Sequence, residues 1–174
     1  MVVGKGMGTP RQLDPNALGD HIDRLYRAAR SLTGSREEAE DLVQETFARV
    51  LQKPRLLRSD DDLGYLLRVL RNTFISMRRS AARRPQATAP PETLDYIEDE
   101  GAVHPQARME LAEVYAAISE LPPDFRDAVV AIDVVGLSYR QAAQALHVRE
   151  ATITTRLHRG RQRIARSLEP PQGD

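Results

Sequence analysis

The 174-residue chain contains no cysteine and no tryptophan, and aromatic residues make up only 5% of it. Without cysteine, it cannot form disulfides, thiolate metal sites or thiol-based redox sensors. The scarcity of aromatic residues and of β-branched runs disfavours a β-sandwich, because its sheets need such residues. Arg, Ala, Leu, Glu and Asp dominate instead, and this composition predicts an all-α fold.

A long hydrophobic run and a net charge are also missing. No apolar stretch approaches the length of a membrane span, and the opening residues, MVVGKGMGTPRQ, lack the apolar core of a secretory signal. These absences predict a cytoplasmic protein. The 25 basic and 25 acidic residues cancel, yet the signs are separated, since residues 85–110 carry one basic and six acidic residues.

Prolines and acidic residues mark a break in the middle of the chain. Residues 85–107 hold four prolines together with the acidic run, a composition that favours extended chain. We predict an acidic linker there, between two small helical domains at 14–84 and 108–168, with tails at 1–13 and 169–174. From composition alone, a plain spacer explains the linker as well as a functional segment does.

In the first domain, apolar residues recur at helical spacing three times. The pattern predicts helices over 16–33, 35–53 and 63–84, with Gly34 ending the first, and with Ser35 and Glu38 as a capping box for the second. The inward stripe expected for the second helix consists of Ala39, Leu42, Val43, Phe47, Val50 and Leu51.

In the second domain, helices are predicted over 107–121, 123–135 and 138–146, followed by a last helix that ends near residue 168. The last two helices flank a brief turn at residues 147–148 and have the shape of a helix-turn-helix. Small residues stand where these helices would cross, namely Ala142 and Ala143. The inward stripe expected for the last helix is Ile153, Leu157, Ile164 and Leu168.

The stretch ITTRLHRGRQR, residues 153–163, places four arginines and a histidine in the last helix with no acid among them. A merely solvated helix face usually interleaves Glu with Arg. Arg can fork onto guanine or phosphate, and Thr can meet a base edge or a thymine methyl group. We therefore favour DNA binding over an ordinary exposed arginine face.

A second acid-free basic block covers residues 65–84, where Asn72 and Thr73 sit among six arginines. Two such blocks predict two separated contacts on one nucleic acid, with strongly salt-dependent binding. For residues 78–84 alone, a basic helix end that matches the helix dipole is an alternative explanation.

An acidic motif, EAEDLVQETF, precedes that block and places Asp41 and Glu45 one helical turn apart. Like charges at this spacing cost some helix stability. A basic partner would justify the cost, although an exposed acidic face alone is the commoner explanation.

Nothing in the sequence supports catalysis, a metal or a cofactor. The four histidines are scattered, the acids at 60–62 are more typical of a solvated loop than of a magnesium site, and there is no Gly-rich phosphate loop.

In this order, the blocks resemble the extracytoplasmic-function (ECF) sigma factors of bacterial RNA polymerase. SREEAEDLVQETFARVL looks like the family's region 2.2, LGYLLRVLRNTFISMRR looks like regions 2.3 and 2.4, and the chain from LPPDFRDAVV to RGRQRI is similar to region 4. The resemblance covers roughly residues 14–168. It implies a sigma factor that binds core RNA polymerase, recognises the −10 and −35 promoter elements and directs transcription initiation, with no small-molecule substrate.

The resemblance also implies roles for individual residues and partners. The helix that docks on the β′ clamp helices of the polymerase is matched by Asp41, Gln44 and Glu45. The loop at 58–64 matches one that pockets a flipped −10 base, and the helix that holds the separated −10 strand is matched by Arg68, Arg71, Asn72, Arg78 and Arg79. The helix that enters the major groove at −35 is matched by Thr154, Thr155, Arg156, His158, Arg159 and Arg163. The implied partners are the β′ clamp helices, the β flap, promoter DNA and an anti-sigma factor, which is often membrane anchored.

His147 departs from the family pattern, because it takes a turn position usually held by Gly, and we expect a left-handed backbone there. Two other classes of protein stay open. A sigma-like protein could sequester an anti-sigma factor without binding promoters, but the basic helices argue against it. An ordinary helix-turn-helix repressor would leave the acidic helix and the linker without a purpose.

Overall fold

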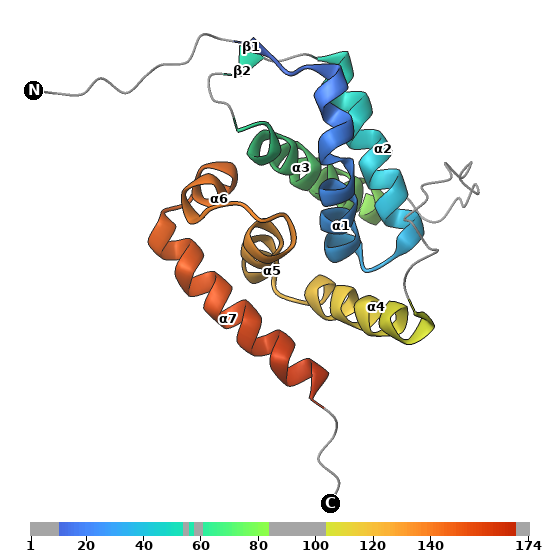
Figure 1. Ribbon diagram of the computed structural model, residues 1–174, viewed down its shortest axis with the longest axis vertical. Helices are drawn as coiled ribbons and strands as arrows, with labels where there is room; N and C mark the ends of the chain where they lie inside the picture. Colours follow the sequence, from blue (N-terminus) through green and yellow to red (C-terminus); the bar gives the residue numbers. More distant parts are fainter. Residues whose placement is uncertain (1–10, 54–55, 58–60, 84–103, 170–174) are drawn as a thin grey trace, which may run out of the picture.

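The computed structural model describes residues 11–53, 56–57, 61–83 and 104–169 of the chain, and these are almost wholly helical, which confirms the predicted fold class (Figure 1). The elements are β1 (Arg11–Gln12), the 3₁₀ helix η1 (Pro15–His21), α1 (Ile22–Thr33), α2 (Arg36–Gln52), β2 (Leu56–Leu57), α3 (Asp62–Arg83), α4 (Pro105–Ser119), α5 (Pro123–Val129), the π-helix η2 (Val130–Val134), α6 (Tyr139–Leu146) and α7 (Glu150–Leu168).

A short antiparallel ladder joins β1 to β2 and corrects the tail predicted for residues 1–13. Arg11 belongs to the fold, because its Nη2 atom lies 2.5 Å from Oδ1 of Asp62. Asp62 is therefore paired, and its neighbour Asp61 accepts a hydrogen bond from the backbone N–H of Gly64 at 2.9 Å. These two acids are not the freely solvated loop residues that we expected. Two-residue strands have no periodicity that a sequence could reveal.

The first predicted helix is α-helical only from Ile22 onward, because the residues before it form η1. Asp14 accepts a hydrogen bond from the N–H of Asn16, and a proline follows it, so that both residues favour a tight first turn. At the other end of α1, Gly34 adopts φ 73°, as predicted for a helix terminus.

The boundaries of the second half differ from expectation in two places. Helix α4 begins at Pro105, inside the range predicted as linker, because proline suits the first position of a helix; most of that linker lies outside the described residues. The helix predicted over 123–135 changes to π geometry over η2, where the N–H of Val135 donates to the carbonyl oxygen of Val130 at 2.9 Å.

Helices α6 and α7 form the predicted helix-turn-helix. Ser138 and Gln141 make a reciprocal capping box at the start of α6, with bonds of 3.2 and 2.9 Å. His147 in the turn has φ 55° and ψ 43°, which confirms the left-handed backbone. Ala142 and Ala143 are buried at the crossing, as expected.

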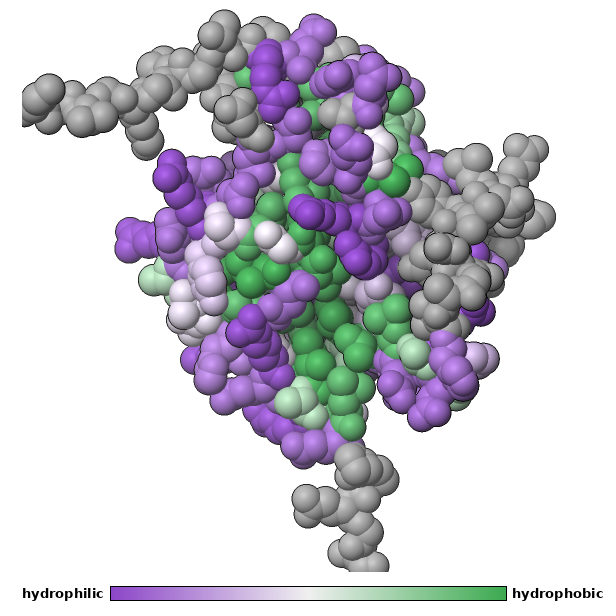
Figure 2. Space-filling model, in the orientation of Figure 1, coloured by the Kyte–Doolittle hydropathy of each residue, from purple (hydrophilic) through white to green (hydrophobic). Residues whose placement is uncertain are grey.

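One hydrophobic core runs through both halves of the molecule. Helix α1 packs against α2 of its own half and also against α4 and η2, while α3 packs against α6 (Figure 1). Figure 2 shows hydrophobic side chains in a band that continues from one half into the other. The two predicted domains therefore form one packed body.

Two residues of the predicted inward stripes lie at the surface. Leu51 is 52% exposed and Leu168 is 41% exposed, and each stands in the last turn of its helix. The spacing of apolar residues predicts which face of a helix is buried, but it does not show whether another element packs against the last turn of that face.

None of the described helices is both long and apolar enough to cross a bilayer.

Candidate nucleic-acid interface

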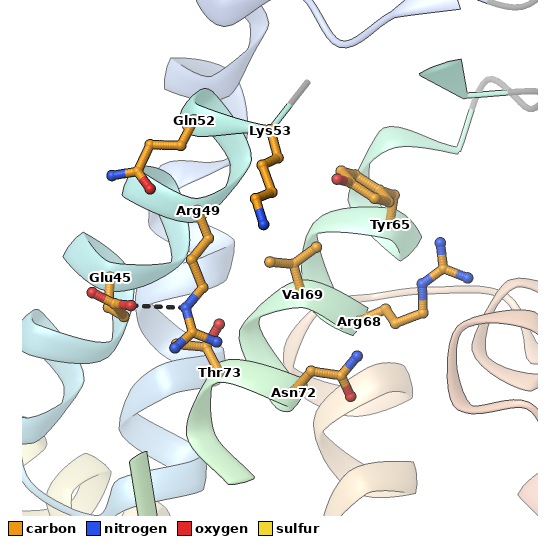
Figure 3. A pocket seen from close by; sticks show the side chains of 9 residues that line it. All are labelled: Glu45, Arg49, Gln52, Lys53, Tyr65, Arg68, Val69, Asn72 and Thr73. Atoms are coloured by element: carbon orange, nitrogen blue, oxygen red, sulfur yellow. Dashed lines mark hydrogen bonds and ion pairs between the residues drawn. The ribbon is translucent and has the colours of Figure 1, made fainter. Parts of the chain in front are cut away.

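A surface pocket of about 440 Å³ opens between α2 and α3 (Figure 3). Three cations, one acid, an aromatic ring and polar side chains surround it. Its lining residues are Glu45, Arg49, Gln52, Lys53, Tyr65, Arg68, Val69, Asn72 and Thr73. The described residues of the loop at 58–64, to which the resemblance gave the flipped-base role, do not line this pocket.

The pocket has the chemistry that a nucleotide requires. The guanidinium carbon of Arg68 lies 5.7 Å from the centre of the Tyr65 ring, and the amide of Asn72 is on the same helix face (Figure 3). A base can stack on an aromatic ring or a guanidinium plane and hydrogen-bond to an amide, while cations hold its phosphate. The arrangement can therefore hold an unstacked base of a single strand.

The hydroxyl group of Thr73 also lines the pocket, although the sequence analysis assigned no role to this residue. It is fully buried, and its Oγ1 atom has no hydrogen-bond partner within the described part of the chain. A buried hydroxyl without a partner costs about 1–3 kcal/mol. Its position next to Asn72 in an acid-free helix was the only signal in the sequence.

Further along α3, a second hollow shares Asn72 with the first and is lined also by Ile75, Ser76, Arg79, Ser80 and Arg83. Arg78 lies over the ring of Phe74, with 5.8 Å between its guanidinium carbon and the ring centre. Among the residues predicted to hold the −10 strand, Arg71 contacts the second half, because its Nε atom donates to Oδ2 of Asp127 at 2.5 Å.

The predicted docking residues lie together on α2, where Asp41, Gln44 and Glu45 are all half-buried. Burial raises the pKa of Asp41 above its ordinary value, and the nearby charges of Glu40 and Glu37 raise it further. Glu45 accepts a hydrogen bond from Nε of Arg49 at 2.7 Å, so this carboxylate belongs both to the predicted docking face and to the rim of the pocket.

Helix α7 exposes most of the residues predicted to read the −35 element. Thr154, Thr155, His158 and Arg159 are all exposed. The two threonine hydroxyls donate to carbonyl oxygens one turn earlier in the helix at 3.2 Å, and each hydroxyl oxygen can still accept a hydrogen bond.

Other arginines of α7 contact residues of α5 and η2. Arg156 donates to Asp124 at 2.7 Å, and the guanidinium of Arg163 lies 5.3 Å from the centre of the Phe125 ring. Arg161 makes two hydrogen bonds to Asp133, at 2.6 and 2.9 Å, and these raise its pKa. The helix therefore presents less free positive charge than its composition suggests.

The two halves of the fold coincide with two family matches. The Sigma-70 region 2 family matches residues 18–84, and the Sigma-70 region 4 family matches residues 111–164. The fold and its basic helices thus define a protein of the sigma-70 class.

Similarity to individual proteins narrows the class. EcfG of Rhodopseudomonas palustris is 31% identical over 84% of this chain and 80% of its own, and SigM of Mycobacterium tuberculosis is 33% identical over 85% and 73%. The chain belongs to the ECF family of RNA polymerase sigma factors. It is also 38% identical to SigE of Mycolicibacterium smegmatis over 83% of its length, but spans only 57% of that protein.

Solved structures share the fold at lower identity. RpoE of Bartonella quintana, in complex with the anti-sigma factor NepR, superimposes with a TM-score of 0.68 at 24% identity over 90% of this chain and 97% of that one. CnrH, in complex with the cytosolic domain of CnrY, gives a TM-score of 0.61 at 24% identity over 88% and 85%.

Proposed function

We propose that this chain is a promoter-recognising sigma factor, which binds core RNA polymerase in the cytoplasm and directs it to start sites without catalysing a reaction itself. The observation that carries the proposal is the presence, in one chain, of a basic pocket-bearing helix α3 and a basic helix α7 within a helix-turn-helix. Each offers a separate contact for one element of a promoter.

At the −10 element, α3 holds the separated strand. Taking a base out of the stack costs a few kcal/mol, which stacking beside Tyr65 and Arg68 and hydrogen bonding to Asn72 offset. Arg49 and Lys53 on the facing rim of the pocket neutralise the adjoining phosphates. Arg78 and Arg79 continue the contact along the backbone.

At the −35 element, α7 enters the major groove with its first two turns. The exposed side chains of Thr154, Thr155, His158 and Arg159 contact base edges. Arg156 and Arg163, which are held by the chain's own residues, position the helix and contact phosphates at its edge.

Polymerase docking uses surfaces on both halves. Asp41, Gln44 and Glu45 bind the β′ clamp helices. The β flap binds the second half, where α4 and α7 pack together and leave Met109 68% and Leu111 43% exposed. RpoE was solved with the anti-sigma factor NepR, and CnrH with the cytosolic domain of CnrY. We propose that an anti-sigma factor covers the polymerase-docking surfaces of this chain.

Transcription in vitro with purified core polymerase and a library of promoter fragments tests the function. We expect promoter-specific transcripts that depend on the added chain. Binding to an anti-sigma factor without any promoter-specific transcript would instead establish the alternative, a sigma-like protein that only sequesters its inhibitor.

A pair of variants in α7 tests the −35 contact within the same assay. Arg159→Ala is expected to reduce transcription from −35-dependent promoters about tenfold or more, since a good base contact contributes about 1–3 kcal/mol. Arg166→Ala, an equal charge change near the end of the same helix, is expected to have little effect, and both variants should bind core polymerase normally. An equal loss of transcription from the two variants contradicts base reading by the first turns of α7.

A further inference from the structure

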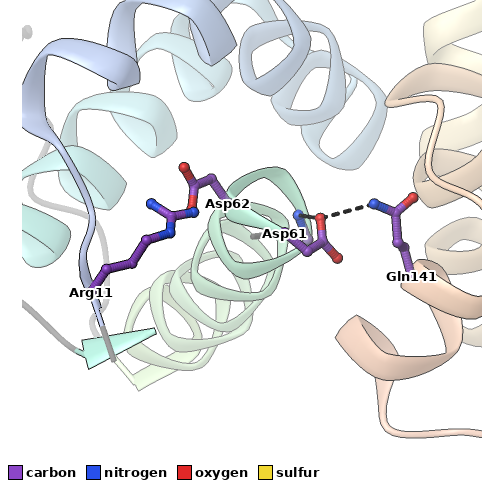
Figure 4. Close-up of polar contacts among 5 residues, drawn as sticks. Arg11, Asp61, Asp62 and Gln141 are labelled. Atoms are coloured by element: carbon purple, nitrogen blue, oxygen red, sulfur yellow. Dashed lines mark hydrogen bonds and ion pairs between the residues drawn. The ribbon is translucent and has the colours of Figure 1, made fainter. Parts of the chain in front are cut away.

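The first described residues of the chain are joined to the beginning of helix α3. Arg11 and Gln12 of β1 pair in antiparallel register with Leu57 and Leu56 of β2. The side chain of Arg11 reaches Asp62, the first residue of α3, where its Nη2 atom lies 2.5 Å from Oδ1 (Figure 4). A two-stranded ladder is marginally stable by itself, and the ion pair therefore strengthens the junction between β1 and the helix.

This ion pair is partly withdrawn from solvent. The side chain of Asp62 is 14% exposed and that of Arg11 is 36% exposed, so that the attraction is screened less than between two fully exposed groups. The carboxylate of Asp62 also lies in the first turn of α3, where the helix dipole favours a negative charge. Helix ends fray when nothing holds them, and the pair therefore favours an intact first turn.

Tyr65 stands about one helical turn after Asp62 and belongs to two hollows. In the pocket between α2 and α3, the centre of its ring lies 5.7 Å from the guanidinium carbon of Arg68 (Figure 3). Tyr65 also lines a smaller hollow of about 90 Å³. The other residues of the smaller hollow are Gln12, Leu13, Pro15, Leu18, Val50 and Leu51. The segment that begins with β1 is thus next to the residue that forms the aromatic wall of the pocket.

We propose that Arg11 is a positioning residue for promoter recognition, which acts through its ion pair with Asp62 to hold Tyr65 in the wall of the pocket between α2 and α3. The inference rests on the proposed function, because it takes this pocket as the site of an unstacked −10 base. Neither member of the ion pair lines the pocket, so their effect on the strand passes through Tyr65. A ring that is fixed before the strand arrives loses little freedom on binding, and such preorganisation strengthens binding.

Asp62→Asn separates this positioning from general electrostatics. The substitution removes an acid, so charge attraction alone predicts tighter binding of a nucleic acid. Positioning predicts the opposite, a loss of affinity of about three- to tenfold, because stacking on Tyr65 is weakened. Fluorescence anisotropy measures the affinity, with the labelled single-stranded non-template −10 segment of a promoter recovered by the transcription assay.

A pair of arginine variants supplies the matched comparison. Arg11→Ala is expected to cause the same loss of affinity as Asp62→Asn, and it replaces that variant if Asp62→Asn fails to fold. Arg36→Ala makes an equal charge change at an ion pair within α2, where Nε of Arg36 lies 3.1 Å from Oε1 of Glu40, and should leave the affinity nearly unchanged. Equal losses from the two arginine variants overturn the proposal, and so does unchanged or tighter binding by a folded Asp62→Asn chain.

The double variant Arg11→Ala with Asp62→Asn completes the cycle. Because the two residues act as one pair, the double variant should bind the −10 segment about as well as either single variant does. Losses that add would show that the two side chains affect the strand independently, which overturns the proposal.

A measurement without DNA tests the positioning step directly. The chain has no tryptophan, so Tyr65→Trp places a single indole in the wall of the pocket. In that background, Arg11→Ala should shift the emission to longer wavelength and lower its anisotropy, while Arg36→Ala changes neither and circular dichroism shows each chain to be folded. Unchanged emission and anisotropy after Arg11→Ala overturn the proposal. Failure of the proposed function gives a different result, in which the wild-type chain yields no promoter-specific transcript although the indole still responds to Arg11→Ala.

Discussion

Asp41 occupies an electrostatically unfavourable position on α2. Its half-buried carboxylate faces Glu37 and Glu40, and its pKa is raised by burial and by these two charges. A raised pKa in the folded chain means that the charged form is disfavoured, so a stabilising contribution is present below the ordinary value of 3.8 and is lost as the pH rises through the folded value.

Asp41→Asn should therefore raise the free energy of unfolding by about 0.5 kcal/mol at pH 7, because it removes like-charge repulsion within α2. Urea unfolding measures this difference, which should shrink as the pH falls through the raised pKa toward 3.8. The same variant should weaken binding to core polymerase. A gain in stability with unchanged polymerase affinity would count against Asp41 as a docking residue.

Thr73 is a second residue whose buried polar group is unfavourable in the free protein, and we propose that its hydroxyl contacts the bound strand. Thr73→Val keeps the shape but removes the unpartnered hydroxyl, so that the free energy of unfolding should stay the same or rise by about 1 kcal/mol. Affinity for the −10 strand should fall about three- to tenfold, if one hydrogen bond to the bound base is lost. Both are measured on the same preparation, by urea unfolding and by fluorescence anisotropy.

Thr46→Val is the matched control for that experiment. Thr46 is equally buried, but its hydroxyl donates to the carbonyl oxygen of Leu42 at 2.6 Å. This substitution should lower stability without affecting the −10 strand. If Thr73→Val behaved as Thr46→Val does, the hydroxyl of Thr73 would have no role in the pocket.

At the scale of elements, helix periodicity predicted α2, α3 and α7 and the face of α7 that is exposed. It did not predict that Asp124 and Asp133 hold Arg156 and Arg161, because these partners are 32 and 28 residues apart along the chain. A periodic pattern reports which face of a helix is polar, but not which side chain of another helix meets it.

The close approach of α5 and α7 depends on Gly160. A Cβ atom there would lie 2.6 Å from Cγ2 of Val129 and 3.3 Å from the carbonyl oxygen of Phe125. Gly160→Ala should lower stability by about 1–2 kcal/mol, because overpacking outweighs the gain of about 1 kcal/mol in helix propensity. Thermal unfolding should show a lower midpoint, whereas Gly19→Ala, whose Cβ would meet nothing within 4 Å, should leave the midpoint unchanged or raised.

At the scale of the whole molecule, the sequence identified two helical units but not their packing into one body. The acidic, proline-rich segment suggested separation, and no local pattern indicates that Arg71 and Asp127, 56 residues apart, form a pair. Contacts of this kind depend on the complementarity of two complete surfaces. The pocket between α2 and α3 was likewise predictable only as a basic helix, since its hollow shape arises from two elements together.

A continuous core predicts cooperative behaviour. The described body should unfold in a single transition, with coincident curves from circular dichroism and tyrosine fluorescence, because core residues of both halves pack together. Asp127→Lys should separate this into two transitions, one for each half. Two transitions in the wild-type chain would contradict the single core.

The π-helix η2 (Val130–Val134) makes the packing of the second half sensitive to the number of residues in the chain there. A π turn accommodates one residue more than an α-helix does, and the helical stretch that contains it supplies Asp127 to Arg71 of the first half and Asp133 to Arg161 of α7. A one-residue deletion there would rotate everything that follows by about 100° relative to α5. A change in length at this one turn would therefore alter how α6 and α7 pack against α5 and against the first half, while the basic residues of α3 and α7 keep their identity.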